Sequence, residues 1–134
     1  MVSNRAKGFR TERRVEKFFI DRGYITYRVP GSTRFCKKVD LFGFFDILCM
    51  RREKNIFVCR KAWVQVKTNK RVPNVDDFIE FSKKHLGAED DIFLFTWFEK
   101  KRIWEINKIS FIGAMHNPIK VEEKDIPDYM DRYT

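Results

Sequence analysis

The sequence predicts an α/β domain in which a mixed β-sheet is flanked by helices. Apolar residues recur at helical spacing in two segments, and runs rich in β-branched and aromatic residues lie between and after them. The expected order is helix, three strands, helix, two strands. A chain of 134 residues without internal repeats or Gly/Ser linkers is typical of one domain, 1–134. We expect its core over residues 5–107 and a tail over residues 108–134 that contributes a short strand or loop packing.

The first helix is expected to begin at a Ser3 or Asn4 cap and to end near Arg22, before Gly23. The apolar residues of this segment that fall roughly at helical spacing are Phe9, Val15, Phe18 and Phe19. They predict one buried helix face.

Three strands are expected next. Residues 24–29 (YITYRV) read as the first, and residues 30–38 form a polar, basic loop after it. Residues 44–50 (FFDILCM) form a nearly continuous apolar run, which is typical of a strand buried on both faces. Residues 56–68 return as the third strand, with an interruption expected near residues 60–61.

The second helix is expected over residues 75–85, capped by Asn74 and closed by Gly87. Residues 92–98 and 102–107 then predict two strands joined by a polar turn. The aromatic residues Trp97, Phe98 and Trp104 on these strands are suited to stacking on bases, but residues of this kind are more often part of a core or an interface.

The positive charge is concentrated in one half of the chain. Residues 1–73 carry 19 Lys and Arg against 6 Asp and Glu, whereas residues 74–134 carry 9 against 13. Such asymmetry indicates a positive face for a polyanion, because each phosphate contact releases condensed counterions. A solvated surface without a partner is the alternative.

Two other classes of protein are not favoured. No apolar run approaches the length of a membrane span, and the basic N-terminus lacks the apolar segment of a signal peptide, so no membrane association is expected. The three cysteines form no CxxC pair, which indicates neither a zinc site nor a disulfide framework. We therefore expect a cytoplasmic protein with reduced thiols.

Polar residues interrupt the apolar strands at three positions. Asp46 lies between Phe45 and Ile47, and Gln65 and Lys67 lie two residues apart near the end of the third strand. Buried ionisable groups are costly unless they are paired or bind a metal ion. Alternation along the strand places Gln65 and Lys67 on one side, and a hairpin would bring Asp46 beside them.

Such a cluster has the groups needed for phosphodiester hydrolysis. A carboxylate with one or two further oxygens can hold Mg²⁺, which polarises a phosphate and lowers the pKa of a bound water. A neighbouring lysine can position that water or stabilise the developing charge. A structural ion pair between Asp46 and Lys67 is the alternative.

The order of these motifs resembles the PD-(D/E)XK nuclease superfamily, and within it the archaeal-type Holliday junction resolvases and their phage and viral relatives. The matching segments are Gly8-Phe9-Arg10-Thr11-Glu12-Arg13 on the first helix, Arg28-Val29-Pro30-Gly31-Ser32, Asp46, and Gln65-Val66-Lys67. The resemblance covers residues 5–98. It implies a restriction-endonuclease-like αβββαβ core.

The resemblance also implies roles for individual residues. Asp46 would be the main metal ligand, joined by Gln65 and the backbone carbonyl of Val66. Glu12 would approach the metal from the helix, directly or through water. Lys67 would be the catalytic lysine, and Ser32 a loop residue near the scissile phosphate.

Several features depart from the pattern or leave alternatives open. Gln65 stands where the superfamily usually has a carboxylate, which leaves room for weaker metal affinity or lost activity. Glu16 is a weaker helix candidate than Glu12. Asp40 is either a second acid or a loop residue that makes local turn hydrogen bonds.

The function implied is a metal-dependent, structure-selective endonuclease that uses Mg²⁺, or Mn²⁺ in its place, on branched DNA such as Holliday junctions. Resolvases of this type act as homodimers, and the apolar segments 92–98 and 102–107 would suit an interface. The alternatives are a nuclease-fold DNA-binding module without catalysis and a phage-type nuclease that acts on other DNA structures. The expected DNA contacts are Arg5, Lys7, Arg10, Arg13, Arg34, Lys37, Lys38, Lys70 and Arg71.

Overall fold

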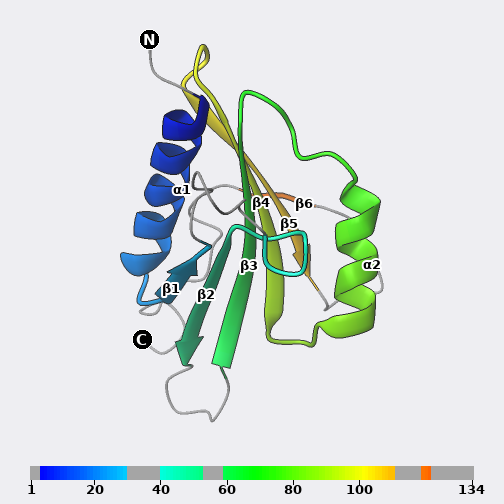
Figure 1. Ribbon diagram of the computed structural model, residues 1–134. Helices are drawn as coiled ribbons and strands as arrows, with labels where there is room; N and C mark the ends of the chain where they lie inside the picture. The colour runs from blue at the N-terminus through cyan, green and yellow to red at the C-terminus, as the bar shows by residue number, and fades with distance from the viewer. Residues whose placement is uncertain (1–3, 30–39, 53–58, 111–118, 122–134) are drawn as a thin grey trace, which may run out of the picture.

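A computed structural model describes residues 4–29, 40–52, 59–110 and 119–121. These residues form a six-stranded sheet with one helix on each face, which confirms the α/β class (Figure 1). The elements are α1 (Asn4–Ile20), β1 (Ile25–Arg28), β2 (Ile47–Arg52), β3 (Cys59–Thr68), α2 (Val75–His85), β4 (Asp90–Phe98), β5 (Ile103–Ser110) and β6 (Ile119–Val121). Neither helix in the described ranges is long and apolar enough to cross a membrane.

The six strands lie side by side in their chain order. β3 and β4 are parallel, and each other pair of neighbours is antiparallel. Helix α2 makes the crossover that a parallel pair requires. The carboxyl ends of β3 and β4 therefore meet at one edge of the sheet.

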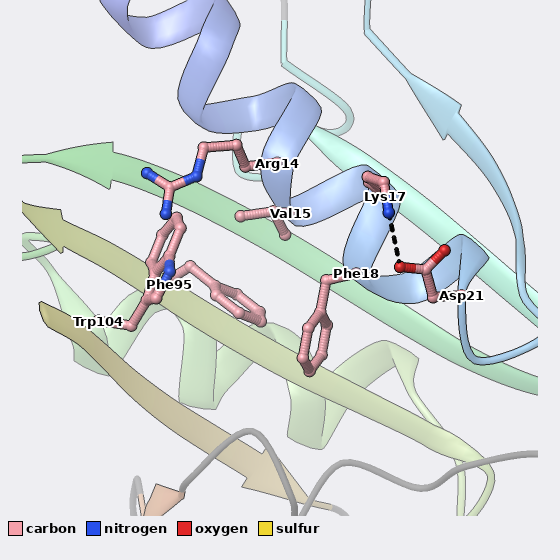
Figure 2. Close-up of a pocket in the computed structure, with 7 residues that line it drawn as sticks. All are labelled: Arg14, Val15, Lys17, Phe18, Asp21, Phe95 and Trp104. Carbon is pink, nitrogen blue, oxygen red and sulfur yellow. Dashed lines mark hydrogen bonds and ion pairs between the residues drawn. The ribbon is translucent and has the colours of Figure 1, made fainter.

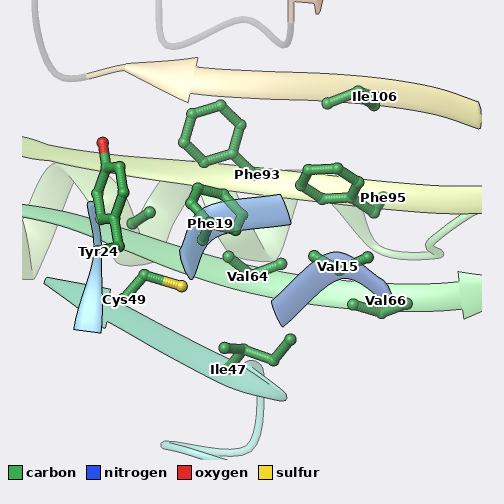
Figure 3. Packing of buried hydrophobic residues seen from close by; sticks show 11 residues of the cluster. Val15, Phe19, Tyr24, Ile47, Cys49, Val64, Val66, Phe93, Phe95 and Ile106 are labelled. Carbon is green, nitrogen blue, oxygen red and sulfur yellow. The ribbon is translucent and has the colours of Figure 1, made fainter. Parts of the chain in front are cut away.

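The face of the sheet under α1 holds the first core. Val15 and Phe19 of α1 pack against Ile47, Val64 and Phe93 of the strands beneath (Figure 3). All five side chains are at most 1% exposed. Burying an aliphatic or aromatic side chain of this size contributes about 2 kcal/mol, so this layer holds α1 firmly on the sheet.

The opposite face holds a second core under α2. Phe45, Phe78, Ile92 and Ile109 are buried there, with Trp63 and several half-buried aromatic residues packed against them. β4 therefore has apolar partners on both faces, and its residues 90–96 are all buried. Burial within the chain accounts for the apolar character of residues 92–96.

β2 is shorter than the sequence predicts. The backbone N–H of Phe45 donates to the carbonyl of Leu41 at 3.1 Å, and residues 42–44 form a turn. Phe42 and Gly43 both have positive φ there, at 54° and 77°. Apolar composition cannot distinguish this tight turn from a strand, so Asp46 lies at a bend before β2 and not inside a strand.

β3 is continuous through residues 60–61, where the sequence predicted an interruption. Arg60 is 7% exposed, and its Nη1 donates to Asp91 Oδ2 at 2.7 Å. Lys61 pairs with Asp90, which also accepts from Trp63 Nε1 at 3.1 Å. Partners on β4 thus compensate the charges that indicated a break.

The helix ends differ in detail from the caps that were expected. Ser3 lies outside the described residues, and Asn4 is the first residue of α1. Asn74 precedes α2 with a left-handed φ of 57°, but its side chain makes no capping hydrogen bond. Gly87 lies one residue beyond the Leu86 cap, and its N–H donates to Asp90 Oδ2 at 2.8 Å.

Tyr24 lies at the start of β1 in the core under α1 and is 4% exposed. Burial raises its pKa from 10.0 to about 12, against the opposing effect of Arg51 and Arg60. The folded protein therefore keeps the phenol proton at a pH at which the unfolded chain loses it.

This difference predicts a loss of stability between pH 10 and 12. Below pH 10 the contribution is complete, and over the interval the free energy of unfolding should fall by about 3 kcal/mol. Urea denaturation of Tyr24→Phe and of the wild type across this range will measure it. The variant should lose less stability than the wild type as the pH rises; equal losses would show that Tyr24 does not contribute.

Candidate active site

Asp46 forms the centre of the candidate site, at the bend that leads into β2. It is 3% exposed. Its backbone N–H donates to the carbonyl of Val64 at 2.8 Å, and its Oδ2 accepts from the N–H of Val66 at 2.8 Å. The carboxylate thus accepts a backbone hydrogen bond that a backbone carbonyl would accept in a regular ladder with β3. This hydrogen bond fixes its orientation at the point where β2 and β3 separate.

Gln65 lies directly beside this carboxylate and is 6% exposed. One end of its amide group faces both the carbonyl of Phe44 and Asp46 Oδ2. With nitrogen at that end, the amide donates to both oxygens, at 3.2 Å to Asp46. With oxygen at that end, three oxygens face one another, and only a cation could compensate their repulsion.

Lys67 lies two residues further along β3. It shares the row of Trp63 and Gln65, on the sheet face that α2 covers. It is half-buried, and it forms no ion pair with Asp46, although both side chains belong to the described part of the chain. The structural Asp46–Lys67 pair is therefore not what holds Asp46 in place.

The backbone carbonyl of Val66 points to the same side of β3 as its N–H group. The N–H and C=O groups of one strand residue point to the same side of the strand. The N–H of Val66 donates to Asp46, so the carbonyl of Val66 also points to the side of β3 on which Asp46 lies, next to the start of β2. Asp46, Gln65 and Val66 thus bring a carboxylate, an amide and a peptide oxygen together.

Glu12 approaches this end of the sheet from α1. It is 9% exposed, although it is a glutamate on a helix surface. The preceding residue, Thr11, accepts a hydrogen bond from Thr68 Oγ1 at 3.0 Å. Because Thr68 follows Lys67, this contact fixes α1 near the end of β3 that carries the candidate site.

Two other acids have local roles. Glu16 accepts from Thr26 Oγ1 at 2.9 Å, which ties α1 to β1 one helical turn beyond Glu12. Asp40 opens the turn before β2, where its backbone carbonyl accepts from the N–H of Gly43 at 2.9 Å.

The expected DNA contacts fall into three groups. Arg10 and Arg13 are exposed on α1, and Lys70 is exposed after β3. Arg71 is exposed too, but its Nε donates to Glu105 Oε1 at 2.8 Å and its Nη2 to Oε2 at 3.1 Å, so its charge is paired within the chain. The remaining expected DNA contacts lie outside the described residues or have undescribed side chains: Arg34, Lys37, Lys38, Arg5 and Lys7. Ser32, the residue expected near the scissile phosphate, also lies outside the described residues.

The sequence did not identify one basic segment at this edge. Lys100, Lys101 and Arg102 are exposed in the β4–β5 turn. Asn69, just after β3, donates through its amide to Glu99 Oε2 and accepts from the N–H of Glu99, each at 2.9 Å. These bonds hold the basic turn next to the end of β3. The turn itself was predicted, but its position depends on the parallel pairing of β3 and β4.

Arg28 is a second residue that the sequence gave only as part of a motif. Its guanidinium lies over the ring of Phe9, 4.0 Å from the centroid. Its Nη1 is buried, and no described residue gives it a hydrogen-bond partner. A buried cationic donor with no acceptor is costly, and an anionic ligand would satisfy it.

The donor set fits a hard cation that needs few protein ligands. Within the described residues no three His, Cys, Asp or Glu side chains gather into a metal-binding group. Mg²⁺ is commonly held by one or two carboxylates and keeps several waters. Asp46 and the Val66 carbonyl meet that requirement, and the Gln65 amide would add its oxygen only by turning out of the orientation in which its nitrogen donates to Phe44 and Asp46.

Comparison of the sequence with models of protein families gives no match, and comparison with curated proteins gives no significant match. The chemistry of the site therefore rests on its own residues.

The Gln65 amide can be tested by converting it to a carboxylate. Gln65→Glu places a second negative charge 3.2 Å from Asp46 Oδ2. Without divalent metal, the two carboxylates should repel and lower the melting temperature at pH 8. Because Mg²⁺ binds two carboxylates better than one, 10 mM Mg²⁺ should then raise the melting temperature more than in the wild type.

Asn74→Asp is the matched control, since it makes the same change of an amide to a carboxylate at an exposed position. It should respond to Mg²⁺ as the wild type does. An equal response of Gln65→Glu and Asn74→Asp would contradict a cation site at Asp46.

Proposed function

We propose that the protein is a metal-dependent endonuclease that hydrolyses phosphodiester bonds in DNA. The proposal is carried by one observation: Asp46 is buried and held by the N–H of Val66, with Gln65 against it and Lys67, which has no ion pair among the described residues, two residues further along the strand. The order α1, β1, β2, β3, α2, β4 also agrees with the αβββαβ core of the PD-(D/E)XK nucleases.

Each residue of the cluster has a task in this reaction. The hydrogen bond from Val66 fixes the orientation of the Asp46 carboxylate, which would act on the phosphate. Lys67 supplies an ammonium group that stabilises the negative charge developing on the phosphate. Bound by Asp46, Gln65 and the Val66 carbonyl, Mg²⁺ or Mn²⁺ would supply the Lewis acid that polarises the phosphate. Glu12 would add a carboxylate from α1.

The DNA would bind across the edge that carries these residues. Exposed cations occur there on α1 (Arg10 and Arg13), after β3 (Lys70) and in the β4–β5 turn. The buried Nη1 of Arg28 supplies a further donor for a phosphate. Contacts of this kind position the backbone and do not read bases, which suits recognition of DNA by its shape.

Branched DNA, with Holliday junctions as the first candidate, is the substrate that the motif order favours. A symmetric junction is suited to a homodimer. The surface that favours dimerisation is the apolar row on β1 and β2: Ile25, Tyr27 and Met50 are 74%, 55% and 39% exposed. Among the described strands β1 is also an edge strand, with one side open to pairing.

A second candidate function is DNA binding without catalysis. With its amide nitrogen toward Asp46, Gln65 satisfies both neighbouring oxygens by hydrogen bonds. The cluster is then complete without a metal ion.

Substitution of the cluster separates the two functions. Asp46→Ala and Lys67→Ala should each lower the cleavage rate of a four-way junction at least about 100-fold, because each removes a group that acts on the phosphate. Junction affinity, measured by gel shift without divalent metal, should change only a few-fold. Lys84→Ala, an exposed cation on α2, serves as the matched control and should cleave normally.

The wild type should be tested in parallel with Mg²⁺ and with Mn²⁺ on four-way junction, flap, single-stranded and duplex DNA. Cleavage that stops in EDTA excludes the binding-only function, and the preferred substrate decides between a resolvase and a nuclease for other structures. Undiminished cleavage by Asp46→Ala or Lys67→Ala would rule out the assigned site.

A further inference from the structure

A groove separates α1 from the β4–β5 side of the sheet, on the flank of α1 away from β1. It encloses about 270 Å³. Figure 2 shows Phe18 of α1 and Phe95 and Trp104 of the strands along it, with Arg14 and Lys17 on the helix at its rim. The volume is near the lower limit, roughly 300 Å³, of pockets that take small ligands, so one planar ring system is an appropriate occupant.

Three aromatic rings line the groove, and two of them, Phe18 and Trp104, are only partly buried. Trp104 packs against Trp97 with 5.0 Å between ring centroids, and against the edge of Phe95 at 5.8 Å. Trp97, Trp104 and Phe18 are all half-buried, unlike the fully covered Phe93 and Phe19 nearby. Rings that keep one part accessible on a rigid sheet can stack on a base, whatever its sequence.

The rim carries two cations, Arg14 and Lys17, and one carboxylate, Asp21. The guanidinium of Arg14 lies 4.2 Å from the ring centroid of Trp97 and 5.0 Å from that of Trp104. Among the described residues Arg14 has no acidic partner, whereas Lys17 bonds to Asp21 at 3.0 Å. Lys100, Lys101 and Arg102 continue the positive charge beyond Trp97. An aromatic floor with this rim is complementary to a base and its phosphates, and not to an uncharged apolar ligand.

The groove also begins close to the candidate active site. Trp97 is the register partner of Thr68, the residue after Lys67. Adjacent strands lie about 4.8 Å apart. Lys67 lies on the face under α2 and the groove on the face under α1, so a DNA strand held at the cluster would pass round this edge of the sheet to reach the groove.

We infer that this groove binds one unpaired nucleotide of a DNA strand. The base stacks on Trp104, and a flanking phosphate contacts Arg14. The inference rests on the proposed function in taking DNA as the substrate. It adds that the substrate presents an unpaired nucleotide, as a flap does and as a four-way junction does where its branch point opens.

Fluorescence anisotropy with two probes tests this inference: a labelled oligo-dT and a base-free oligomer with the same sugar-phosphate backbone. The wild type should bind oligo-dT about tenfold more tightly, because stacking of a base is worth about 1–3 kcal/mol. Trp104→Leu should lose this preference and bind both probes equally. Arg14→Gln should weaken the binding of both and reduce the salt dependence by about one phosphate contact.

Lys84→Gln on α2 is the control for a lost positive charge and should match the wild type on both probes. Circular dichroism and the melting temperature confirm that each variant is folded. If Trp104→Leu does not fold, the wild-type preference between the probes and the effect of Arg14→Gln decide. Equal binding of both probes by the wild type, or an undiminished preference in Trp104→Leu, would overturn the inference.

These measurements contain no divalent metal, so they do not depend on cleavage. A base preference that requires Trp104 in a protein that never cleaves DNA would support the groove and contradict the nuclease. Cleavage of junctions without any base preference would do the reverse.

Discussion

The parallel pairing of β3 and β4 is the constraint on which the rest of the structure depends. It requires a crossover, which α2 provides, and it places both strands in the middle of the sheet, covered on two faces. It also brings the ends of both strands to one edge. Lys67, the tryptophan pair and the basic β4–β5 turn are neighbours for this reason, although the chain between Lys67 and Trp97 includes the whole of α2.

The charged side chains at the two ends of the β3–β4 pair have different kinds of partner. At the amino ends, Arg60 bonds to the buried Asp91 and Lys61 to Asp90, so the ions compensate one another inside the protein. At the carboxyl ends, Asp46 accepts from a backbone N–H and lies against the Gln65 amide, and Lys67 has no counterion among the described residues. Paired ions at the amino ends stabilise the fold, whereas Asp46 and Lys67, both among the described residues, form no such ion pair at the other end.

Backbone strain is found in the connections around the same edge. Phe42 in the turn before Asp46, Asn69 after β3 and Arg102 in the β4–β5 turn all have positive φ, at 54°, 63° and 53°. Such conformations are costly for residues with a Cβ and persist where surrounding contacts enforce them. For Asn69 those contacts are visible, since its side chain exchanges two hydrogen bonds with Glu99.

The sequence by itself determined the order of the elements and the residues of the cluster. Helical and strand periodicities are local, so they identified α1, α2 and five of the strands, and Asp46, Gln65 and Lys67 were recognised because polar groups are costly among apolar neighbours. Only the tertiary structure decided what those groups contact. The partner of Arg60 lies 31 residues away, the bend before Asp46 depends on a bridge between Leu41 and Phe45, and the groove needs α1 beside Trp104. Such contacts join distant segments through their packing, and no local pattern of residue types specifies which segments will meet.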